Sequence, residues 1–450
     1  MAQQDLIESP VKELVRRFLI TFVLGVIVYR LGVFVPIPGV NAEALKAIVT
    51  GGLGGDADPL KAMLAYANMF NGGAIAQASI FGLGITPYIS ASIILQLMTF
   101  SIPALKALQK EGETGRRKIN QYTRYATLLI ALVQSAIAAI ALSRYSSGGN
   151  VLLTPEALSN TPMFIAQSML VITTGSMLIL WIADQITRFG VGNGVSIVIM
   201  ISIMAYLPTA FAGHATDLGP LLLLIAVCLI IIACIIVVVQ AVRRVNLEQQ
   251  RRVQGNRVYG GAQTTLPLKL NQANVIPVIF AQPVLVLLTM LAANQFAAAV
   301  GLDQFMGYGN PGHRLIFAIL IVAFTYFYIS ITFDLNDLTS HFKQAGFFVR
   351  GIKPGKNTVD YIGSIMTRIT FVGAIFLALI SIMPETLATT LGLQGQGAVL
   401  LGGTGLLIVV GVLLDVMQKV GSFMLAHKYG GVAGAGGLGA GKKPGSGKRF

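Results

Sequence analysis

Ten apolar stretches divide this chain and constrain its fold more than any other feature. They cover residues 18–35, 75–100, 123–142, 163–183, 195–211, 218–242, 273–293, 314–333, 368–386 and 398–420. Most of these stretches are close in length to the roughly 20 residues that an α-helix needs to cross the ~30 Å hydrocarbon core of a bilayer. Only 11% of the residues are charged, against about 25% in soluble domains. The sequence therefore predicts an all-α polytopic membrane protein with ten transmembrane helices.

The basic residues are distributed unevenly across the predicted membrane. If the spans alternate in direction, 27 of the 32 Lys and Arg residues fall on the side that holds both chain ends, and five fall on the other. The positive-inside rule then places both termini in the cytoplasm. This topology explains the pI of about 9.8 without nucleic acid binding. Arg30, inside the first stretch, is expected to extend outward to the opposite interface.

The predicted spans lack the groups that most membrane transporters and enzymes use. Asp184 and Asp415 lie near the ends of their stretches, and the four His residues fall in loops or at stretch ends without metal-ligand spacing. An ion-coupled transporter needs ionisable groups at mid-membrane. The Gly-rich segment 436–443 lacks the Ser or Thr of a phosphate-binding loop. We therefore expect no metal, no cofactor and no enzymatic activity, and a flexible basic tail at 428–450.

The region between the first and third stretches is the most unusual. Leu60–Phe70 can form a short amphipathic helix, which Asn71-Gly72-Gly73 would end, and a full spanning helix is expected over 75–100 despite Gly82, Gly84 and Pro87. A short helix that enters the membrane is tolerated only where protein or a cavity surrounds it. A plain amphipathic helix on the external surface is the alternative, and the residues alone leave both open.

Two loops on the cytoplasmic side, 243–271 and 335–366, are longer than a helix connection requires. Their basic tips suit RNA phosphates or an acidic protein surface. A generic positive-inside loop would have the same charge, so the residues leave this alternative open as well.

Several motifs in this order and spacing resemble the SecY/Sec61-alpha family of protein-translocation channels, in its bacterial branch. The resemblance runs from about residue 10 to 429 and rests on FVPIPGV (34–40), NMFNGGA with ASIFGLGITPYISASIILQL (68–97), RKINQYTRY (117–125), GVGNGVSI (190–197), NRVYGG with LPLKLN (256–271), NVIPVIFA (274–281), GIKPG (351–355) and GGTGLLIVVGVLLD (402–415).

The resemblance implies two pseudo-symmetric, inverted halves around a central pore, here 1–211 and 212–427, with a plug at about 60–74. It implies a channel that carries unfolded secretory polypeptides across the membrane and releases signal or transmembrane segments sideways into lipid. The energy would come from a partner motor or from the ribosome, because the chain has no ATPase motif.

The family's functional positions can be carried over residue by residue. A narrow pore ring is implied at Ile85, Ile89, Ile199, Ile279 and Ile408, although a single isoleucine is more typical of ordinary packing. The plug is implied at Leu64, Ala67, Met69, Phe70, Asn71, Gly72 and Gly73. Polar residues near the lateral gate are Ser90, Ser92, Gln96, Gln134 and Gln282. Docking of SecA or the ribosome is implied at Arg243, Arg244, Arg251, Arg252, Arg257, Arg350, Lys353 and Lys356.

The implied partners are small membrane subunits of the SecE and SecG type, the SecA ATPase, the ribosome, signal sequences and secretory preproteins, SecD/SecF, YidC and membrane lipids. The implied location is the cytoplasmic (inner) membrane of a bacterium. Two positions depart from the family pattern. Asn256-Arg257 stands where the family usually has paired Arg residues before Val-Tyr, and Lys353 stands in the turn that usually carries Arg. Lys keeps the charge but lacks the bidentate fork of Arg, which puts the docking contacts in doubt.

Overall fold

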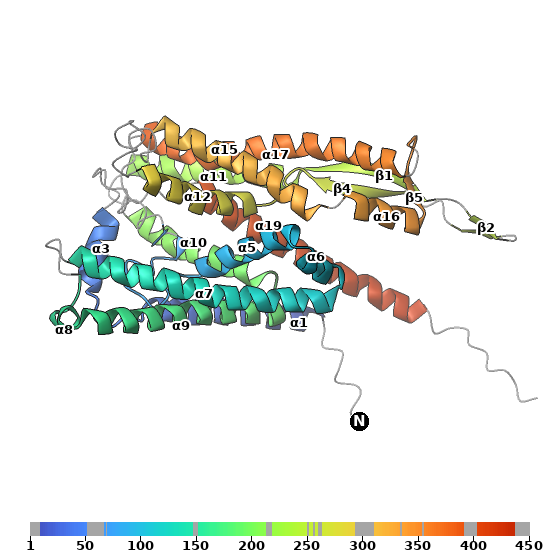
Figure 1. Ribbon diagram of the computed structural model, residues 1–450. Helices are drawn as coiled ribbons and strands as arrows, with labels where there is room; N and C mark the ends of the chain where they lie inside the picture. Colours follow the sequence, from blue (N-terminus) through green and yellow to red (C-terminus); the bar gives the residue numbers. More distant parts are fainter. Residues whose placement is uncertain are drawn as a thin grey trace, which may run out of the picture.

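The computed structural model describes residues 10–51, 67–68, 70–146, 152–212, 218–249, 252–254, 257–259, 263–292, 310–333, 335–352, 355–390 and 403–436. All ten predicted stretches contain a helix (Figure 1). The long helices are α1 Pro10–Phe22, π-helix η1 Val23–Val28 and α2 Tyr29–Val33 in direct succession, α5 Thr86–Ser101, α7 Glu113–Ser146, α9 Thr161–Phe189, α10 Gly194–Ala212, α11 Leu218–Gln240, α12 Ile276–Ala292, α15 Pro311–Thr332, α17 Lys356–Thr390 and α19 Gly403–Gly436. Shorter helices are α3 Ala42–Gly51, α6 Pro103–Lys110, α8 Pro155–Ser159 and α16 Leu335–Ala345.

The long helices have the length and composition of membrane spans. Among the described residues, five helices each meet both requirements alone: α7, α9, α15, α17 and α19. The pair α5 and α6, bent by 103°, makes a sixth if it is one span. Shorter apolar segments lie in α10 and α11, at Gly194–Tyr206 and Ile225–Gln240. These helices are consistent with the ten predicted spans.

Large apolar side chains cover the outer surface of the helices. Leu129 on α7 is 64% exposed, Val237 on α11 is 68% exposed and Leu379 on α17 is 63% exposed. Soluble proteins rarely leave wide apolar surfaces in water. In a bilayer the same side chains face lipid tails, so the exposed surface supports the membrane fold that the composition predicts.

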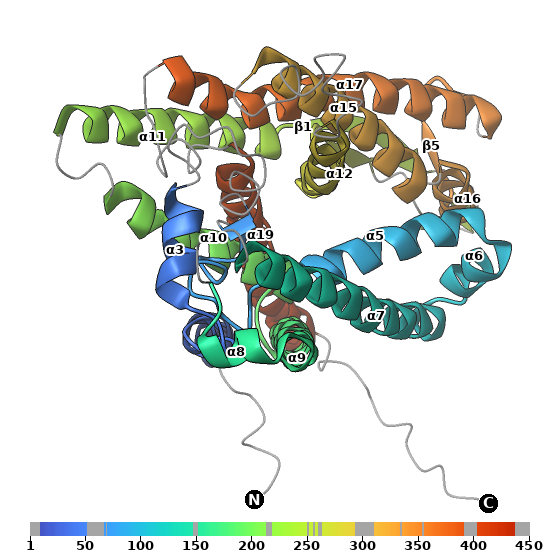
Figure 2. The ribbon, with the colours of Figure 1, turned by 60° about the vertical axis from the view of Figure 1, so that its left-hand side comes forward.

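The helices form two groups that α19 joins (Figures 1 and 2). In the first group, α7 packs on α5 and α9, and α9 packs on α10 and α1. In the second group, α15 packs on α12 and α17. α19 contacts α10 and α1 of the first group as well as α11 and α17 of the second. One hydrophobic core runs through both groups and includes Phe81, Ile182, Ile231, Phe317 and Leu407.

The first long helix contains a π-helical segment where it meets α10. Gly25 is the buried residue of this segment. A Cβ built on Gly25 would lie 2.5 Å from Ile201 Cδ1 of α10 and 3.6 Å from Ile186 Cδ1 of α9. The absence of a side chain at this position therefore lets three helices approach one another closely.

The sequence predicts a spanning helix over 75–100, and this prediction is wrong in its first part. α5 begins only at Thr86, and residues 71–85 form hydrogen-bonded turns. The left-handed backbone at Gly72, Gly73 and Gly84, with φ of +64°, +85° and +57°, breaks the helix, because glycine adopts it without steric cost. Ala78 in the same turns also has a positive φ, of +47°. The apolar residues of 75–85 are enclosed by protein, so this segment does not form a helix in lipid. Of the predicted short helix 60–70, only residues 67, 68 and 70 are described, and these are helical.

The two long loops expected on the cytoplasmic side fold together into a β-sheet, which the sequence analysis did not predict. β1 Val242–Gln249 pairs antiparallel with β4 Gln263–Lys269 and with β5 Phe347–Val349. β2 Arg252–Gln254 and β3 Arg257–Tyr259 form a separate antiparallel pair that extends from this end of the molecule (Figure 1). The three-stranded sheet packs on α17 through a second hydrophobic core that includes Leu247, Leu268, Val349 and Met366. We call this end of the molecule the sheet end and the opposite end the α3 end.

α19 continues beyond its predicted stretch. The helix runs to Gly436, so it includes the first part of the segment 428–450 that the sequence predicts as a flexible tail. Residues 437–450 lie outside the described residues. The flexible basic tail at 428–450 stays a prediction.

Candidate channel gate

The turns at 71–85 are held together by the side chains of two buried asparagines. The Asn71 amide nitrogen donates to Gly82 O at 2.7 Å. Asn68 Oδ1 accepts from the Ala76 backbone N–H at 2.8 Å. Asn68 and Asn71 are 3% and 7% exposed. Each side chain therefore hydrogen-bonds to a backbone group that has no partner within a helix or strand. Buried turns require such partners for their backbone groups.

The same turns lie against the chain that follows α2. Pro36 and Ser79 form an antiparallel bridge. Ile37 N–H donates to Ala78 O at 2.7 Å, and Ile80 N–H donates to Val35 O at 3.0 Å. These contacts anchor the turns to the first long helix at the α3 end, where Ala78 also packs on α3.

Tyr29 on α2 and Ser202 on α10 contact the turns from within the helix bundle. The Tyr29 hydroxyl donates to Asn71 O at 3.2 Å, and the Ser202 hydroxyl donates to Tyr29 Oη at 2.7 Å. The Tyr29 ring stacks on Phe81 with 5.8 Å between the centroids. The sequence analysis missed both hydroxyl residues. The signal for Tyr29 was its position beside Arg30 in an otherwise apolar stretch.

Arg30 does not simply extend away from the protein. Its Nη1 lies 3.4 Å from Gly72 O, and its guanidinium lies over the Phe34 ring at 5.3 Å from the centroid. The charge therefore contacts the turns, and Arg30 is a further residue of this site.

The five isoleucines of the predicted pore ring all belong to the central hydrophobic core. Ile85 precedes α5, Ile199 lies on α10 and Ile408 lies on α19, and these three are 7%, 8% and 2% exposed. Ile89 on α5 and Ile279 on α12 are partly buried against the same core. Four of the five residues lie on α5, α10, α12 and α19, and Ile85 lies directly before α5. Ile85 is also the last residue of the turns, which begin at Asn71 within the predicted plug.

The predicted plug is described only in part. Ala67, Phe70 and Asn71–Gly73 lie in the described residues, and Phe70 packs against the central core. Leu64 and Met69 lie outside them.

The predicted lateral-gate residues lie on two separate pairs of helices. Ser90, Ser92 and Gln96 lie on α5, which packs on α7 with Gln134. In the second pair, Phe280 of α12 makes edge-to-face ring contacts with Phe324 and Tyr328 of α15. Gln134 Oε1 is buried and has no hydrogen-bond partner among the described atoms. The side chain of Gln282 on α12 lies outside the described set.

The predicted docking residues lie at the sheet end. Arg243 and Arg244 are exposed on β1, and Lys356 is exposed at the start of α17. Arg350 follows β5, where its side chain is 81% exposed and lies 3.7 Å from Glu248. The β2–β3 pair brings Arg252 opposite Tyr259 and Arg257 opposite Gln254. Arg251 and Lys353 lie outside the described residues.

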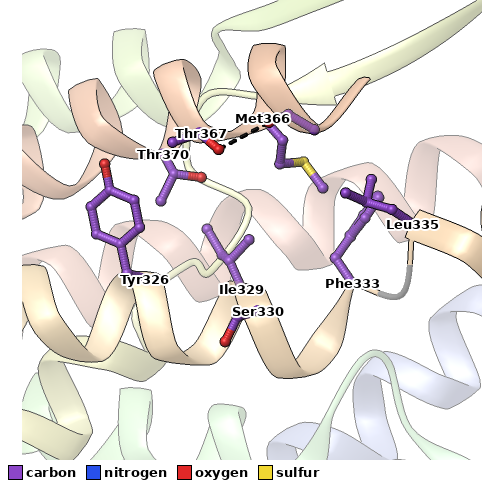
Figure 3. A pocket seen from close by; sticks show the side chains of 9 residues that line it. Tyr326, Ile329, Ser330, Phe333, Leu335, Met366, Thr367 and Thr370 are labelled. Atoms are coloured by element: carbon purple, nitrogen blue, oxygen red, sulfur yellow. Dashed lines mark hydrogen bonds between the residues drawn. The ribbon is translucent and has the colours of Figure 1, made fainter. Parts of the chain in front are cut away.

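Two cavities lie near the sheet end, away from the turns. A cavity of about 510 Å³ is lined by basic and amide side chains of α7 and α9: Arg117, Lys118, Asn120, Gln121, Arg124 and Arg188. Arg124 also pairs with Asp184 at 2.6 Å, which joins the two helices. A cavity of about 250 Å³ lies between α15 and α17 and is lined mainly by apolar and hydroxyl side chains, including Tyr326, Ile329, Ser330, Met366 and Thr370 (Figure 3). Within the described residues, no group of three or more His, Cys, Asp and Glu side chains is placed to hold a metal ion.

The long apolar helices and their packing define this protein as a multi-pass helical membrane protein. Its fold is similar to three solved structures. The first is described as the structure of a protein conducting channel, and the third as Sec61 in the canine ribosome–channel complex from the endoplasmic reticulum. The description of the second states that the plug domain of the SecY protein stabilises the closed state of the translocation channel and maintains a membrane seal. Their TM-scores are 0.62, 0.60 and 0.57, at 13–14% sequence identity, and each comparison covers 93% of this chain and 95% of the other.

The chain belongs to the SecY family. A sequence profile of that family matches residues 79–417. A relative from Escherichia coli K12, named protein translocase subunit SecY, is 39% identical over 431 residues that cover 93% of each chain. A relative of the same name from Thermotoga maritima is 37% identical over 430 residues, which cover 94% of this chain and 95% of the relative. Membership of this family confirms the resemblance seen in the sequence. It identifies the chain as a translocase channel subunit, which is not an enzyme.

Proposed function

We propose that this SecY-family chain forms the pore through which unfolded secretory polypeptides cross the cytoplasmic membrane. The observation that carries the proposal is that all five isoleucines belong to one hydrophobic core, to which α5, α10, α12 and α19 contribute, and that Ile85 ends the turns at 71–85. A ring of isoleucines can adapt to a passing chain, yet it offers water and ions no polar partner. Such a ring, with the plug at 60–74 beside it, keeps an idle channel sealed.

The lateral gate lies between the α5–α7 pair and the α12–α15 pair. Each pair packs closely within itself, which supports movement of the pairs as units. Among the described atoms, Gln134 Oε1 of α7 is buried without a hydrogen-bond partner, and such an atom lowers the stability of its surroundings. A sufficiently apolar signal sequence or transmembrane segment leaves the pore here and enters lipid.

The sheet end is the docking surface for the SecA motor or the ribosome. The paired strands β1 and β5 bring both basic loops into one surface with exposed Arg243, Arg244, Arg350 and Lys356. One of the solved structures with a similar fold is Sec61 in a ribosome–channel complex. We expect charge reversal at Lys353, where the family usually has Arg, to impair motor-driven transport, and normal export in that variant would remove Lys353 from the docking surface.

The further partners are SecE- and SecG-type subunits, SecD/SecF, YidC, signal sequences, preproteins and membrane lipids. The exposed apolar residues of α1, including Phe18 and Phe22, support contact with a small membrane subunit or with lipid. The halves 1–211 and 212–427 move about the connection near residues 208–220. The 27 basic residues on one side support a topology with both termini in the cytoplasm of a bacterium.

The proposal is tested by reconstitution of the full chain in vesicles with a SecE-type subunit, SecA and ATP. We expect a secretory precursor to become protected from added protease, and precursor incubated without ATP should stay accessible. A result in which the precursor never enters while a small solute does would overturn the channel assignment in favour of a transporter.

A further inference from the structure

Two hydroxyl groups from different helices contact the backbone where the plug ends. Ser202 of α10 donates to Tyr29 Oη at 2.7 Å, and Tyr29 of α2 donates to Asn71 O at 3.2 Å. Tyr29 is 1% exposed and Ser202 is 3% exposed. The three groups form a buried chain of hydrogen bonds that leads from the bundle to the plug.

The backbone of the plug also packs directly on the backbone of α10. A Cβ built on Gly72 would lie 3.1 Å from Ser202 O and 3.4 Å from Tyr29 Oη. The left-handed φ of +64° at Gly72 turns the chain at this point. The glycine thus brings the Asn71 carbonyl within reach of the Tyr29 hydroxyl, and the longer contact from Arg30 to Gly72 O adds a third attachment.

The hydrogen bonds of Tyr29 and Ser202 would rearrange if the plug moved. Ser202 Oγ lies 2.8 Å from Val198 O as well, so its single proton is divided between that carbonyl and Tyr29 Oη. If the plug moves away, the Tyr29 hydroxyl loses its acceptor in a site from which water is excluded. The Tyr29 hydroxyl can then donate to Ser202 Oγ, provided that Ser202 gives its own proton to Val198 O, so opening loses the Asn71 hydrogen bond and rearranges the Tyr29–Ser202 pair.

We propose that Tyr29 and Ser202 form a latch that holds the plug in the closed position and sets how often an idle channel opens. The proposal rests on the proposed function, in which residues 60–74 act as the plug. Tyr29 and Ser202 are positioning residues, since they act on the pore only through the Asn71–Gly73 backbone.

The test uses Tyr29→Phe, Ser202→Ala and the double variant in vesicles of the complete complex. Phe at position 29 keeps the ring that stacks on Phe81 and removes only the hydroxyl. Two measurements report the latch: leak of a small ion without motor or precursor, and deuterium uptake by the amides of residues 70–85. One net hydrogen bond corresponds to roughly a two- to tenfold change in an equilibrium. We expect each single variant to raise leak and uptake by about that factor.

The double variant separates a latch from two independent defects. Because both hydroxyls act through one chain of bonds, we expect the double variant to leak little more than Tyr29→Phe alone. Matched controls are Tyr326→Phe and Ser330→Ala on α15, which remove a tyrosine and a serine hydroxyl remote from the plug. The Ser330 hydroxyl donates only within its own helix, to Phe327 O at 2.8 Å. Both controls should leave leak and uptake at the level of the unmodified chain.

Three outcomes are informative. Leak and uptake that rise in the latch variants but not in the controls support the proposal. Unchanged leak and uptake in Tyr29→Phe and Ser202→Ala, while the unmodified complex still protects a precursor, overturn the latch and leave the channel function intact. Failure of the unmodified complex to protect a precursor overturns the proposed function itself, whatever the variants do.

Discussion

Asn71 and Gly84 fit against each other in the turns beside the pore. A Cβ on Gly84 would overlap the Asn71 side-chain oxygen, and the amide nitrogen of the same Asn71 side chain donates to Gly82 O at 2.7 Å. Gly84 also has a φ of +57°. The position therefore needs glycine for two separate reasons, the backbone conformation and the space for the asparagine.

Gly84→Ala should displace the Asn71 side chain and loosen the turns. The left-handed conformation alone makes alanine unfavourable by about 1–2 kcal/mol, and loss of the Asn71 bond adds to this. Gly73→Ala is the matched control, since Gly73 has a φ of +85° and a Cβ added there would meet no atom within 4 Å. We expect ion leak to rise more in Gly84→Ala than in Gly73→Ala. Equal leak in the two variants would show that backbone strain alone, and not the Asn71 contact, matters.

Ile279→Ser should make the idle channel permeable to small ions. The hydroxyl gives water a hydrogen-bond partner in a ring that otherwise excludes it. Ile319→Ser on α15 is the matched control, because Ile319 is 59% exposed on the outer surface. Ion flux from loaded vesicles measures the difference. A leak of the same size in Ile319→Ser would mean that general loosening of the bundle, and not the ring, causes the flux.

Part of this architecture follows from the sequence because its cause is local. A run of about 20 apolar residues forms a helix in lipid whatever its neighbours are, so every predicted stretch contains a helix. The exception is 75–85, where the apolar residues are buried by protein. Apolar content alone cannot distinguish these two environments. The glycines at 72, 73 and 84 indicated a break, but only the structure identifies their left-handed backbone.

The contacts between distant residues could not be predicted in the same way. Tyr29 and Ser202 are 173 positions apart, and no spacing rule pairs residues on different helices. The pairing of Leu247 with Val349 similarly joins two loops that the sequence treats separately. The five ring isoleucines were identified only through the family resemblance, since each resembles an ordinary packing residue.

Asn41→Ala should weaken the support of the turns at the α3 end. Asn41 Oδ1 accepts from the backbone N–H of Glu43 at 3.1 Å and of Ala44 at 3.3 Å, which caps α3. Loss of such a cap lowers stability by about 1 kcal/mol. α3 packs through Leu45 on Ala78 of the turns, so deuterium uptake should rise in both segments. Asn41→Asp keeps an acceptor at the cap and should retain most of the protection; uptake as high as in the alanine variant would argue against the cap.

Arg350→Glu should impair motor docking without lowering the stability of the fold. The Arg350 side chain is 81% exposed, and its pair with Glu248 at 3.7 Å is therefore screened by water. Exposed pairs of this kind contribute little to stability, so the thermal unfolding midpoint should stay close to that of the unmodified chain. Motor affinity should fall, because the variant replaces a positive charge on the docking surface with a negative one.

The salt dependence of SecA-type ATPase stimulation checks this explanation. The difference between Arg350→Glu and the unmodified chain should shrink as ionic strength rises, since salt screens exposed charges beyond about 10 Å at 0.1 M. Lys343→Glu on α16 is the control, because it makes the same charge change at another exposed position near the sheet end. If Lys343→Glu reduces stimulation equally, net charge and not the position of Arg350 governs docking. If neither variant changes stimulation, Arg350 lies outside the docking surface.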